Sequence, residues 1–352
     1  MRILGIETSC DETAAAVVDN GTDLLSNVVA SSMELHAAYG GVVPEIAARS
    51  HIESIIPVID ETISQANTGW AEIDAVAVTY GAGLGGSLLI GVMTARTLAI
   101  AFNKPLVACN HVLGHIYANF ISRTSLPGYS ISADRPEFPL LAVVVSGGHS
   151  QLVLFTDHLN YRLLGRTQDD AIGEAFDKVA KILGLPYPGG PSVAEAAING
   201  NEHAFVLPKA KVGKYDFSFS GLKTAVLRLA QEQIGESYNF PSYRLPERLN
   251  LAQKANIAAS FQLVAAETIA DKVALAIDEF APKCLLLAGG VAANSRLRQV
   301  LAGIASCPMI VPDPKLCTDN GAMIAALGGW QAILKHNYAN PYNLEIAPNL
   351  SM

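Results

Sequence analysis

Residues 2–18 read RILGIETSCDETAAAVV, and this stretch sets the expected fold. The apolar residues among positions 2–6 predict a buried strand, and positions 14–18 predict a second strand that runs back beside it. The polar residues 7–13 form the tip of this predicted hairpin and bring hydroxyl and carboxylate groups together at a strand end. Such a tip can hold a phosphate or its cation, although an ordinary turn has the same composition.

A second strand, tip and strand occur in the other half of the chain. Residues 140–145 are apolar, the tip reads Ser146-Gly147-Gly148-His149-Ser150, and residues 151–155 predict the returning strand. The repeat suggests an internal duplication, with residues 121–139 as the connection between two lobes. The N–H groups of Gly147 and Gly148 can point at anionic oxygens. Two such tips facing each other across a cleft could therefore grip one phosphate group.

Residues 110–117, NHVLGHIY, contain a candidate metal-binding pair. His111 and His115 are four residues apart in a predicted helix, so both imidazoles emerge on one face. Iron and zinc accept such a pair, whereas the alternative is one core histidine and one solvated histidine. The zinc-protease motif places a Glu directly after its first His. Val112 stands there instead, so the protease base is missing.

Further candidates lie at other predicted strand ends and helix starts. Asp319, at the start of the C-terminal helix, could supply a third metal ligand. The glycine-rich residues 80–87 follow a predicted strand at 75–79 and precede a helix at 88–102. They permit either close approach to a ligand or close packing of helix on strand. The short strand expected at 105–108 delivers the chain to His111, where open α/β sheets bind ligands.

The second half of the chain offers nucleotide-binding candidates. Asp177 lies in a helix expected to end at residue 183 and could bind ribose hydroxyls, or it could be solvated. Residues 188–191, Pro-Gly-Gly-Pro, predict a fixed loop with exposed backbone. After a long helix at 256–280 and a strand at 284–287, a double glycine and Asn294 could admit and hydrogen-bond an adenosine.

Composition limits the classes of protein. Half of the 352 residues are hydrophobic and 16% are charged, which is enough for two domains with real cores. The sequence shows neither a secretory signal nor an apolar run of membrane-spanning length, so we expect a cytoplasmic protein and no membrane association. The five cysteines lack close CxxC pairing, which argues against a disulfide framework or a cysteine metal site.

The net charge of −8 means that any nucleic-acid contact must use a local basic patch. A candidate patch surrounds residues 217–221 and comprises Lys209, Lys211, Lys214, Lys223 and Arg228. Ordinary soluble surface is an equally good interpretation of these charges.

Together these motifs resemble one family. They are GIETSCDET at 5–13, GGVVPE at 40–45, HVLGH at 111–115, VSGGH at 145–149, GEAFDK at 173–178, YPGGP at 187–191, FSFSGLK at 217–223, GGV at 289–291 and TDNG at 318–321. The chain resembles the TsaD family of bacterial tRNA N6-adenosine threonylcarbamoyltransferases, formerly called glycoproteases, over nearly its whole length.

The resemblance implies an α/β fold with two lobes, of the actin, sugar-kinase and heat-shock ATPase type, in which ribonuclease-H-like domains are duplicated. We place the lobes at residues 1–130 and 131–352, with the helix from about residue 319 packing back at the cleft. The implied reaction transfers a threonylcarbamoyl group from threonylcarbamoyl-AMP to N6 of the adenosine 3′ of the anticodon. Its implied substrates are tRNAs that read codons beginning with A.

The resemblance also assigns residues. His111, His115 and Asp319 match the ligands of one divalent metal ion per subunit, with iron favoured over zinc. The positions that match the adenylate site are Val144, Val145, Ser146, Gly147, Gly148, Asp177, Gly190 and Asn294. Either His149 or the leaving phosphate is a candidate to remove the proton of the attacking amine.

The implied partners are tRNA, a TsaB-like paralogue and a TsaE-like ATPase, with threonylcarbamoyl-AMP supplied by a TsaC-type enzyme. Two rival classes use the same fold: an ATP-dependent phosphotransferase and a non-catalytic nucleotide-binding scaffold. ATP turnover by the purified protein would favour the first rival. An empty metal site that tolerates substitution would favour the second.

Overall fold

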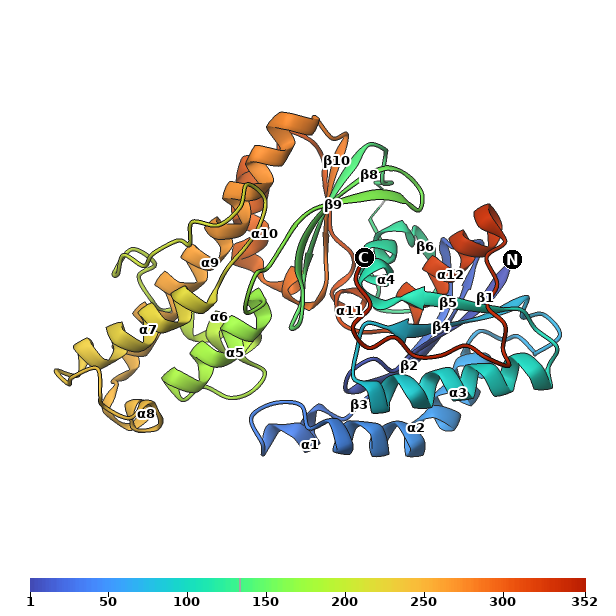
Figure 1. Ribbon diagram of the computed structural model, residues 1–352, viewed down its shortest axis with the longest axis horizontal. Helices are drawn as coiled ribbons and strands as arrows, with labels where there is room; N and C mark the ends of the chain where they lie inside the picture. Colours follow the sequence, from blue (N-terminus) through green and yellow to red (C-terminus); the bar gives the residue numbers. More distant parts are fainter. Residues whose placement is uncertain (133) are drawn as a thin grey trace. The chain divides into compact units, whose positions relative to one another are not determined.

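The computed structural model describes residues 1–132 and 134–352, which form two compact units (Figure 1). The first unit comprises Met1–Glu137 and Ile310–Met352, and the second comprises Phe138–Met309. This division differs from the expected lobes at 1–130 and 131–352. The segment after Met309 belongs to the first unit because its long helix α12 (Gly321–Lys335) packs against the strands that open the chain.

A six-stranded sheet forms the centre of the first unit, in the order β5-β4-β1-β2-β3-β6. Its strands are β1 (Arg2–Glu7), β2 (Glu12–Asp19), β3 (Asp23–Ser31), β4 (Ala75–Gly81), β5 (Leu106–Asn110) and β6 (Arg123–Thr124). β1 and β2 pair antiparallel from Arg2↔Asp19 to Glu7↔Ala14, which confirms the first predicted hairpin. β4 then runs parallel to β1 on its other side.

Both faces of this sheet are covered, which explains why residues 3–6 of β1 are apolar. Leu4 and Ile6 belong to the core that the sheet forms with α2 (Pro44–Gln65) and α3 (Gly85–Ala101), since side chains alternate between the faces of a strand. Gly5 faces α12, and a Cβ built on it would lie 2.3 Å from the Ala325 nitrogen. The helix therefore packs on backbone here. Figure 1 shows α2 and α3 on one side of the sheet and α12 on the other.

Shorter helices complete the first unit: α1 (Met33–Ala37), α4 (His111–Tyr117), the 3-10 turn η1 (Ala118–Phe120) and α11 (Pro314–Cys317). After α12 the chain returns along the sheet. Ala339 forms a bridge with Leu106, and the Ala347 N–H donates to the Tyr80 carbonyl at 2.7 Å. The C-terminal segment thus covers the end of β4.

The second unit contains a five-stranded sheet in the order β11-β10-β7-β8-β9. Its strands are β7 (Leu140–Val145), β8 (Ser150–Asp157), β9 (Asn160–Arg166), β10 (Cys284–Ala288) and β11 (Met309–Ile310). β7 and β8 pair antiparallel from Leu140↔Phe155 to Val145↔Ser150, which confirms the second predicted hairpin. β10 runs parallel to β7, as β4 does to β1. The order 5-4-1-2-3 thus recurs as 11-10-7-8-9, as a duplicated fold requires.

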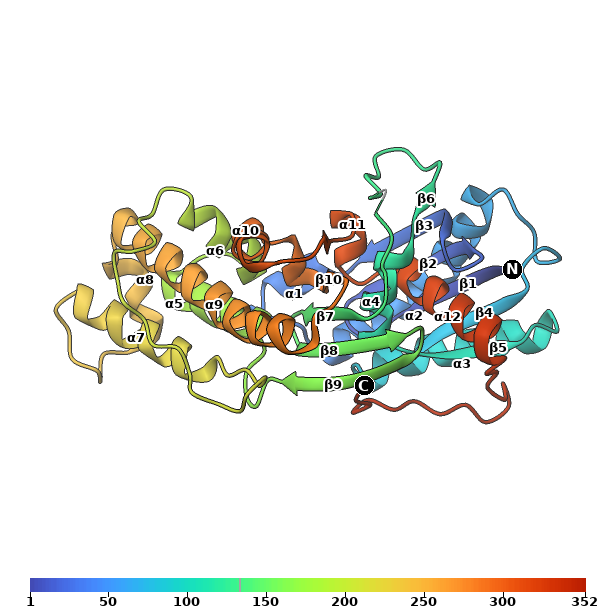
Figure 2. The ribbon, with the colours of Figure 1, turned by 90° about the horizontal axis from the view of Figure 1, so that it is seen from above.

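The helices of the second unit are α5 (Ile172–Leu183), α6 (Gly189–Ala197), α7 (Ser220–Gln233), α8 (Leu245–Arg248), α9 (Leu251–Phe280) and α10 (Ser295–Ile304), with 3-10 turns η2 (Ser242–Arg244) and η3 (Gly290–Ala293). Figure 2 shows α9 running the length of this unit beside α6 and α7. The long helix begins five residues earlier than expected, at Leu251 rather than 256, because Asn250 and Gln253 form a reciprocal capping box.

The prediction of a loop at residues 188–191 is wrong. α6 begins at Gly189, with Pro188 as its N-cap and Pro191 in its first turn. Proline is tolerated in the first turn because the N–H groups there have no acceptor within the helix. Proline at these positions therefore starts a helix instead of preventing one.

Candidate functional site

Three predicted metal ligands converge in the first unit. His111 and His115 lie on α4, which directly follows β5, and Asp319 immediately precedes Asn320, the N-cap of α12. The Nε2 atoms of His115 and His111 lie 3.2 Å and 3.6 Å from Asp319 Oδ1. One ligand atom from each residue fits within 4.8 Å of the others. Segments more than 200 residues apart in sequence thus provide one compact set of donors.

This set of donors fits a divalent metal ion. His115 is 2% exposed, and neither of its ring nitrogens makes a hydrogen bond within the part of the chain that the structure describes. A buried polar group left in this way costs about 1–3 kcal/mol, and a cation at Nε2 would remove that cost. Two imidazoles and one carboxylate suit iron and zinc alike, and three protein ligands leave coordination positions open.

The electrostatic surroundings favour a cation. Burial alone would lower the pKa of His111, but Asp319 and Glu7 outweigh burial and raise it to about 9. Burial, together with the negative charges of Asp319 and Asp11, raises the pKa of Glu12 to about 10. The same causes raise the pKa of the Cys10 thiol. Negative charge is therefore concentrated around Asp319, where a bound cation would offset it.

The tip of the first hairpin lies beside this triad. Glu7 Oε2 lies 3.2 Å from His111 Nδ1, and Ser9 Oγ lies 3.0 Å from the same nitrogen. Sequence reasoning suggested a phosphate or cation at the tip but did not connect these two residues with His111. The sequence alone does not give the order of the strands. In the sheet β1, β4 and β5 are neighbours, and this order brings the tip to the start of α4.

The second hairpin presents an exposed turn in the second unit. Val144 and Val145 are buried in β7, while Gly147 and Gly148 are exposed. The Ser146 N–H donates to the His149 carbonyl at 2.8 Å, and the His149 N–H donates to Ser146 Oγ at 3.1 Å, so the turn is well defined. A Cβ built on Gly147, Gly148 or Gly190 meets no described atom within 4 Å. These three backbone segments are therefore open to a ligand.

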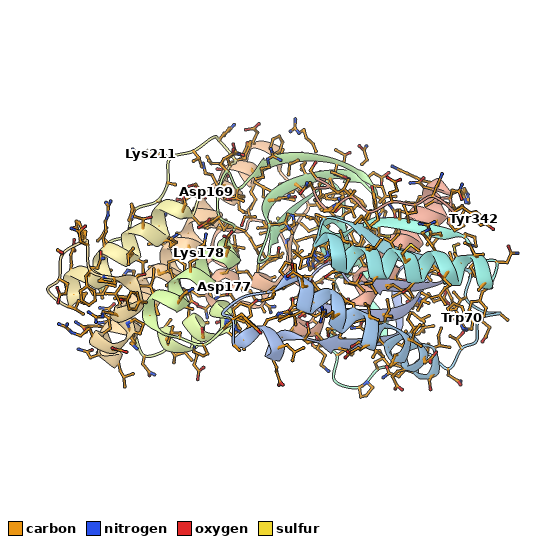
Figure 3. All side chains as sticks on the ribbon, turned by 60° about the horizontal axis from the view of Figure 1, so that its bottom comes forward. Trp70, Asp169, Asp177, Lys178, Lys211 and Tyr342 are labelled. Carbon is orange, nitrogen blue, oxygen red and sulfur yellow. The ribbon has the colours of Figure 1, made fainter. Side chains whose placement is uncertain are left out.

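Asp177 and Asn294 each accept a hydrogen bond from the first turn of a helix in the same unit. Asp177 lies on α5 beside Lys178 (Figure 3), and its Oδ1 accepts the Gly189 N–H at 2.7 Å, which fixes the start of α6. Burial raises the pKa of Asp177. Asn294 caps α10 by accepting the Leu297 N–H at 3.0 Å and donates to Gln262 Oε1 at 2.9 Å. Hydrogen bonds thus hold both side chains in fixed positions, and Asp177 lies against Gly189, the residue before the candidate Gly190.

The glycine-rich residues 80–87 are closely packed, but at Gly81 the packing partner is the C-terminal segment rather than a helix on a strand. A Cβ on Gly81 would lie 2.1 Å from the Ala347 carbonyl oxygen, so the C-terminal segment occupies the space that the glycine leaves. This run contrasts with Gly147, Gly148 and Gly190, whose missing side chains leave open space.

Two of the five residues in the basic patch are paired with carboxylates. Lys209 contacts Glu267 at 3.0 Å and Asp271 at 2.9 Å, and Lys214 forms an ion pair with Glu279. Lys211 is exposed on the segment between α6 and α7 (Figure 3). The patch is therefore less positive than its sequence suggests.

Sequence reasoning missed Asp169, which organises the nearby FSFSG motif. Its carboxylate accepts hydrogen bonds from Ser218 Oγ and Ser220 Oγ, both at 2.6 Å, and from the Phe219 N–H at 2.9 Å. Burial would raise the pKa of Asp169, but these donors lower it overall. The signal was the pair of alternate serines before a helix, which needs an acceptor.

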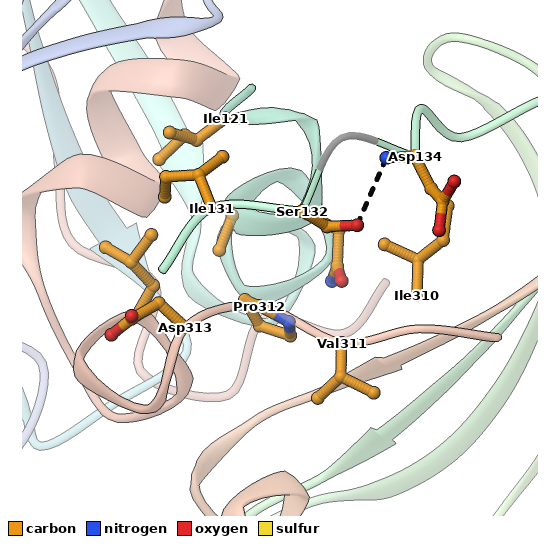
Figure 4. A pocket seen from close by; sticks show the side chains of 11 residues that line it. Ile121, Ile131, Ser132, Asp134, Ile310, Val311, Pro312 and Asp313 are labelled. Carbon is orange, nitrogen blue, oxygen red and sulfur yellow. Dashed lines mark hydrogen bonds between the residues drawn. The ribbon is translucent and has the colours of Figure 1, made fainter. Parts of the chain in front are cut away.

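One small hollow is lined both by the segment that follows α4 and by the segment that leads into α11 (Figure 4). Ile121, Ile131, Pro312 and Asp313 contribute to its lining, and Asp313 Oδ2 accepts the Ser130 N–H at 2.6 Å. Among the described residues its lining includes none of the predicted site residues. We assign it no role.

The duplicated sheets and their covering helices form the fold that is also found in actin-like ATPases and sugar kinases. The activator of the 2-hydroxyisocaproyl-CoA dehydratase from Clostridium difficile, solved with bound ADPNP, is 16% identical with a TM-score of 0.52; the match covers 94% of this chain and 95% of that one. Full-length HypF, solved in its phosphate- and nucleotide-bound form, is 12% identical with a TM-score of 0.57, over 95% of this chain and 46% of that one. At such identities the likeness shows the fold alone.

Sequence similarity identifies the family. Residues 23–326 match the family described as TsaD, tRNA N6-adenosine threonylcarbamoyltransferase. A relative of that name from Thermomicrobium roseum is 52% identical over 92% of this chain and 90% of its own. Another from Moorella thermoacetica is 46% identical over 99% of this chain and 97% of its own. The chain belongs to this family of transferases, as the motifs predicted. Among its described helices, none has the length and apolar character needed to cross a membrane.

Proposed function

We propose that the chain transfers a threonylcarbamoyl group from threonylcarbamoyl-AMP to N6 of the adenosine 3′ of the anticodon, in tRNAs that read codons beginning with A. The product is N6-threonylcarbamoyladenosine. The observation that carries the metal-assisted form of this proposal is the convergence of His111, His115 and Asp319, in a chain of this family.

The chemistry is acyl transfer to an amine. The N6 nitrogen attacks the carbamoyl carbon, the bond from that carbon to the phosphate oxygen breaks, and AMP leaves with the bonding electrons. The amine proton passes to a base, for which His149 and the leaving phosphate are the candidates. Because the mixed anhydride is already activated, the protein needs mainly to orient the amine and to stabilise the developing negative charge.

Each group of residues has a distinct part in this scheme. The N–H groups of the exposed residues Gly147 and Gly148 hold the phosphate of the adenylate, within the segment that runs from Val144. Asp177, Gly190 and Asn294 hold the nucleoside. In the first unit His111, His115 and Asp319 hold one divalent ion, iron in preference to zinc, which supplies Lewis acidity when bound.

The protein acts with partners in this proposal. They are a TsaB-like paralogue and a TsaE-like ATPase, and a TsaC-type enzyme makes threonylcarbamoyl-AMP. The site of action is the cytoplasm, where tRNA is available.

A single-turnover assay tests the function. Purified protein and its partners are mixed with synthetic threonylcarbamoyl-AMP and unmodified tRNA, and the modified adenosine is measured. We expect product from the wild type and from the control variant His203→Ala, whose imidazole lies on the surface of the second unit, 75% exposed. The double variant His111→Ala, His115→Ala should give none. Absence of product from wild type that still binds the adenylate would favour the scaffold or phosphotransferase class, which ATP turnover then separates.

A further inference from the structure

A buried carboxylate lies behind one of the two metal-binding histidines. Glu7 ends β1 and is 0% exposed, and its Oε2 lies 3.2 Å from His111 Nδ1. The other ring nitrogen of His111, Nε2, faces Asp319 Oδ1 at 3.6 Å. The two nitrogens of this imidazole therefore face different groups: Nε2 faces Asp319, and Nδ1 faces Glu7 together with the Ser9 hydroxyl, whose Oγ lies 3.0 Å away.

Glu7 is itself held in place from two directions. The Thr79 hydroxyl, on the neighbouring strand β4, donates to Glu7 Oε2 at 2.5 Å. The Ser9 N–H donates to Glu7 Oε1 at 2.5 Å, so each carboxylate oxygen has a fixed donor. A carboxylate clamped in this way has little freedom to rotate, and it defines one position for the His111 ring.

We infer that Glu7 is a positioning residue for the metal site: it accepts the Nδ1–H of His111 and thereby keeps the Nε2 lone pair directed at the metal ion. This inference rests on the metal site of the proposed function. Metal-binding histidines commonly donate their second N–H to a carboxylate, which fixes both the tautomer and the ring orientation. The geometry of Glu7, His111 and Asp319 has this arrangement.

Other roles for Glu7 do not fit its position. It faces Nδ1, on the opposite side of the ring from Asp319, so it cannot ligate an ion that His111 binds through Nε2. Complete burial keeps it away from a substrate. The second histidine lacks such support, since His115 Nδ1 makes no hydrogen bond within the described residues. His111 is thus the ligand whose orientation the chain fixes by hydrogen bonding.

The test measures Zn²⁺ affinity of the purified full chain by competition with a chromophoric chelator. We expect Glu7→Gln to weaken Zn²⁺ binding about 10–100-fold, because the amide can donate to Nδ1 and so favour the wrong tautomer. The exposed Glu72→Gln, in the same unit, is the matched control and should bind Zn²⁺ as the wild type does. In a His111→Ala background, Glu7→Gln should change the affinity by less than about twofold, since its effect passes through His111.

Two results of the Zn²⁺ titrations would overturn the inference about Glu7. Unchanged Zn²⁺ affinity in a folded Glu7→Gln variant overturns the inference, and so does an equal loss in the His111→Ala background. If Glu7→Gln does not fold, Thr79→Val replaces it, because that variant keeps the carboxylate and removes one clamp. It should show a smaller loss that also disappears with His111→Ala, and unchanged affinity would again overturn the inference. If the wild type fails to bind Zn²⁺, the proposed metal site is refuted. If the wild type and Glu7→Gln bind Zn²⁺ equally well, only the role of Glu7 is refuted.

Discussion

The side chain of Asn110 donates a hydrogen bond to the main-chain carbonyl of Ser351 at 3.3 Å, across 241 residues of sequence. The same side chain accepts the Leu113 N–H at 3.0 Å and so caps the helix that carries both histidines of the proposed metal site. One amide therefore joins the C-terminal segment to the start of α4.

Substitution of Asn110 should separate its two contacts. Asn110→Ala removes both and should lower the free energy of unfolding by about 1 kcal/mol, the usual cost of losing an N-cap. Asn110→Asp keeps an acceptor for the Leu113 N–H but cannot donate to Ser351, so it should retain most of that stability. Chemical denaturation of the three proteins measures the difference. Equal losses in both variants would show that the cap contributes nothing.

Two glycines should respond in opposite ways to alanine. Gly5→Ala brings a Cβ against the backbone of α12 and should cost about 1–3 kcal/mol or more of stability, as overpacking does. Gly147→Ala adds its methyl group in open space, so the melting temperature should stay the same while adenylate affinity falls. Thermal denaturation and adenylate binding measure both effects. A Gly147→Ala protein with unchanged adenylate affinity would remove the second tip from the proposed binding site.

His51 should make the first unit less stable in mild acid. Its Nδ1 lies 2.8 Å from Thr13 Oγ1 and its Nε2 lies 3.0 Å from the Cys10 carbonyl, an arrangement that suits the neutral ring with Nε2–H as donor. Burial lowers the pKa of His51. The unfolded chain then binds a proton more readily, so stability is complete above the unfolded pKa of about 6.5 and falls as the pH drops below it.

Denaturation of wild type and His51→Gln across this pH window tests the linkage. The variant should be less stable at neutral pH, because it loses well-placed contacts, but its stability should depend less on pH below about 6.5. Identical pH dependence in the two proteins would assign the acid sensitivity to other groups.

We expect the basic patch to bind tRNA through the exposed Lys211 rather than through Lys209 and Lys214, which pair with carboxylates. Lys211→Glu should weaken tRNA binding and reduce the slope of log affinity against log salt by about 0.9 for each phosphate that the variant no longer neutralises. Lys209→Glu should have a different effect, mainly on stability, because Lys209 already contacts Glu267 and Asp271. Lys104→Glu in the first unit is the control. Equal tRNA affinity in Lys211→Glu and the control would discard the patch as a contact surface.

The elements that sequence reasoning predicted well are those set by local patterns. Both hairpins, the helix with the two histidines and the end of α5 at Leu183 follow from apolar runs and turn residues within a few positions. The start of α6 at Gly189 was missed because a Pro-Gly-Gly-Pro run occurs both in loops and in first helical turns.

The remaining features depend on contacts between distant segments. The family resemblance brought His111, His115 and Asp319 together, but the place of Glu7 behind His111 depends on the order of β5, β4 and β1 in the sheet. Likewise, the sequence permits either a ligand or close packing at Gly81, and only the contact with the Ala347 carbonyl oxygen favours packing. The assignments of Gly147, Gly148, Gly190, Asp177, Asn294 and His149 to substrate and catalysis stay predictions.

The first unit is discontinuous in sequence, and this has a consequence for biosynthesis. The ribosome delivers Met1–Glu137, then all of the second unit, and only then the segment with Asp319 and α12. Domains tend to fold in the order of their synthesis, but the first sheet lacks the helix that covers one of its faces until the second unit has been synthesised. The nascent chain must therefore carry two histidines without their carboxylate partner while the second unit emerges. A metal ion at the proposed triad could therefore bind all three side chains only after the second unit has been synthesised.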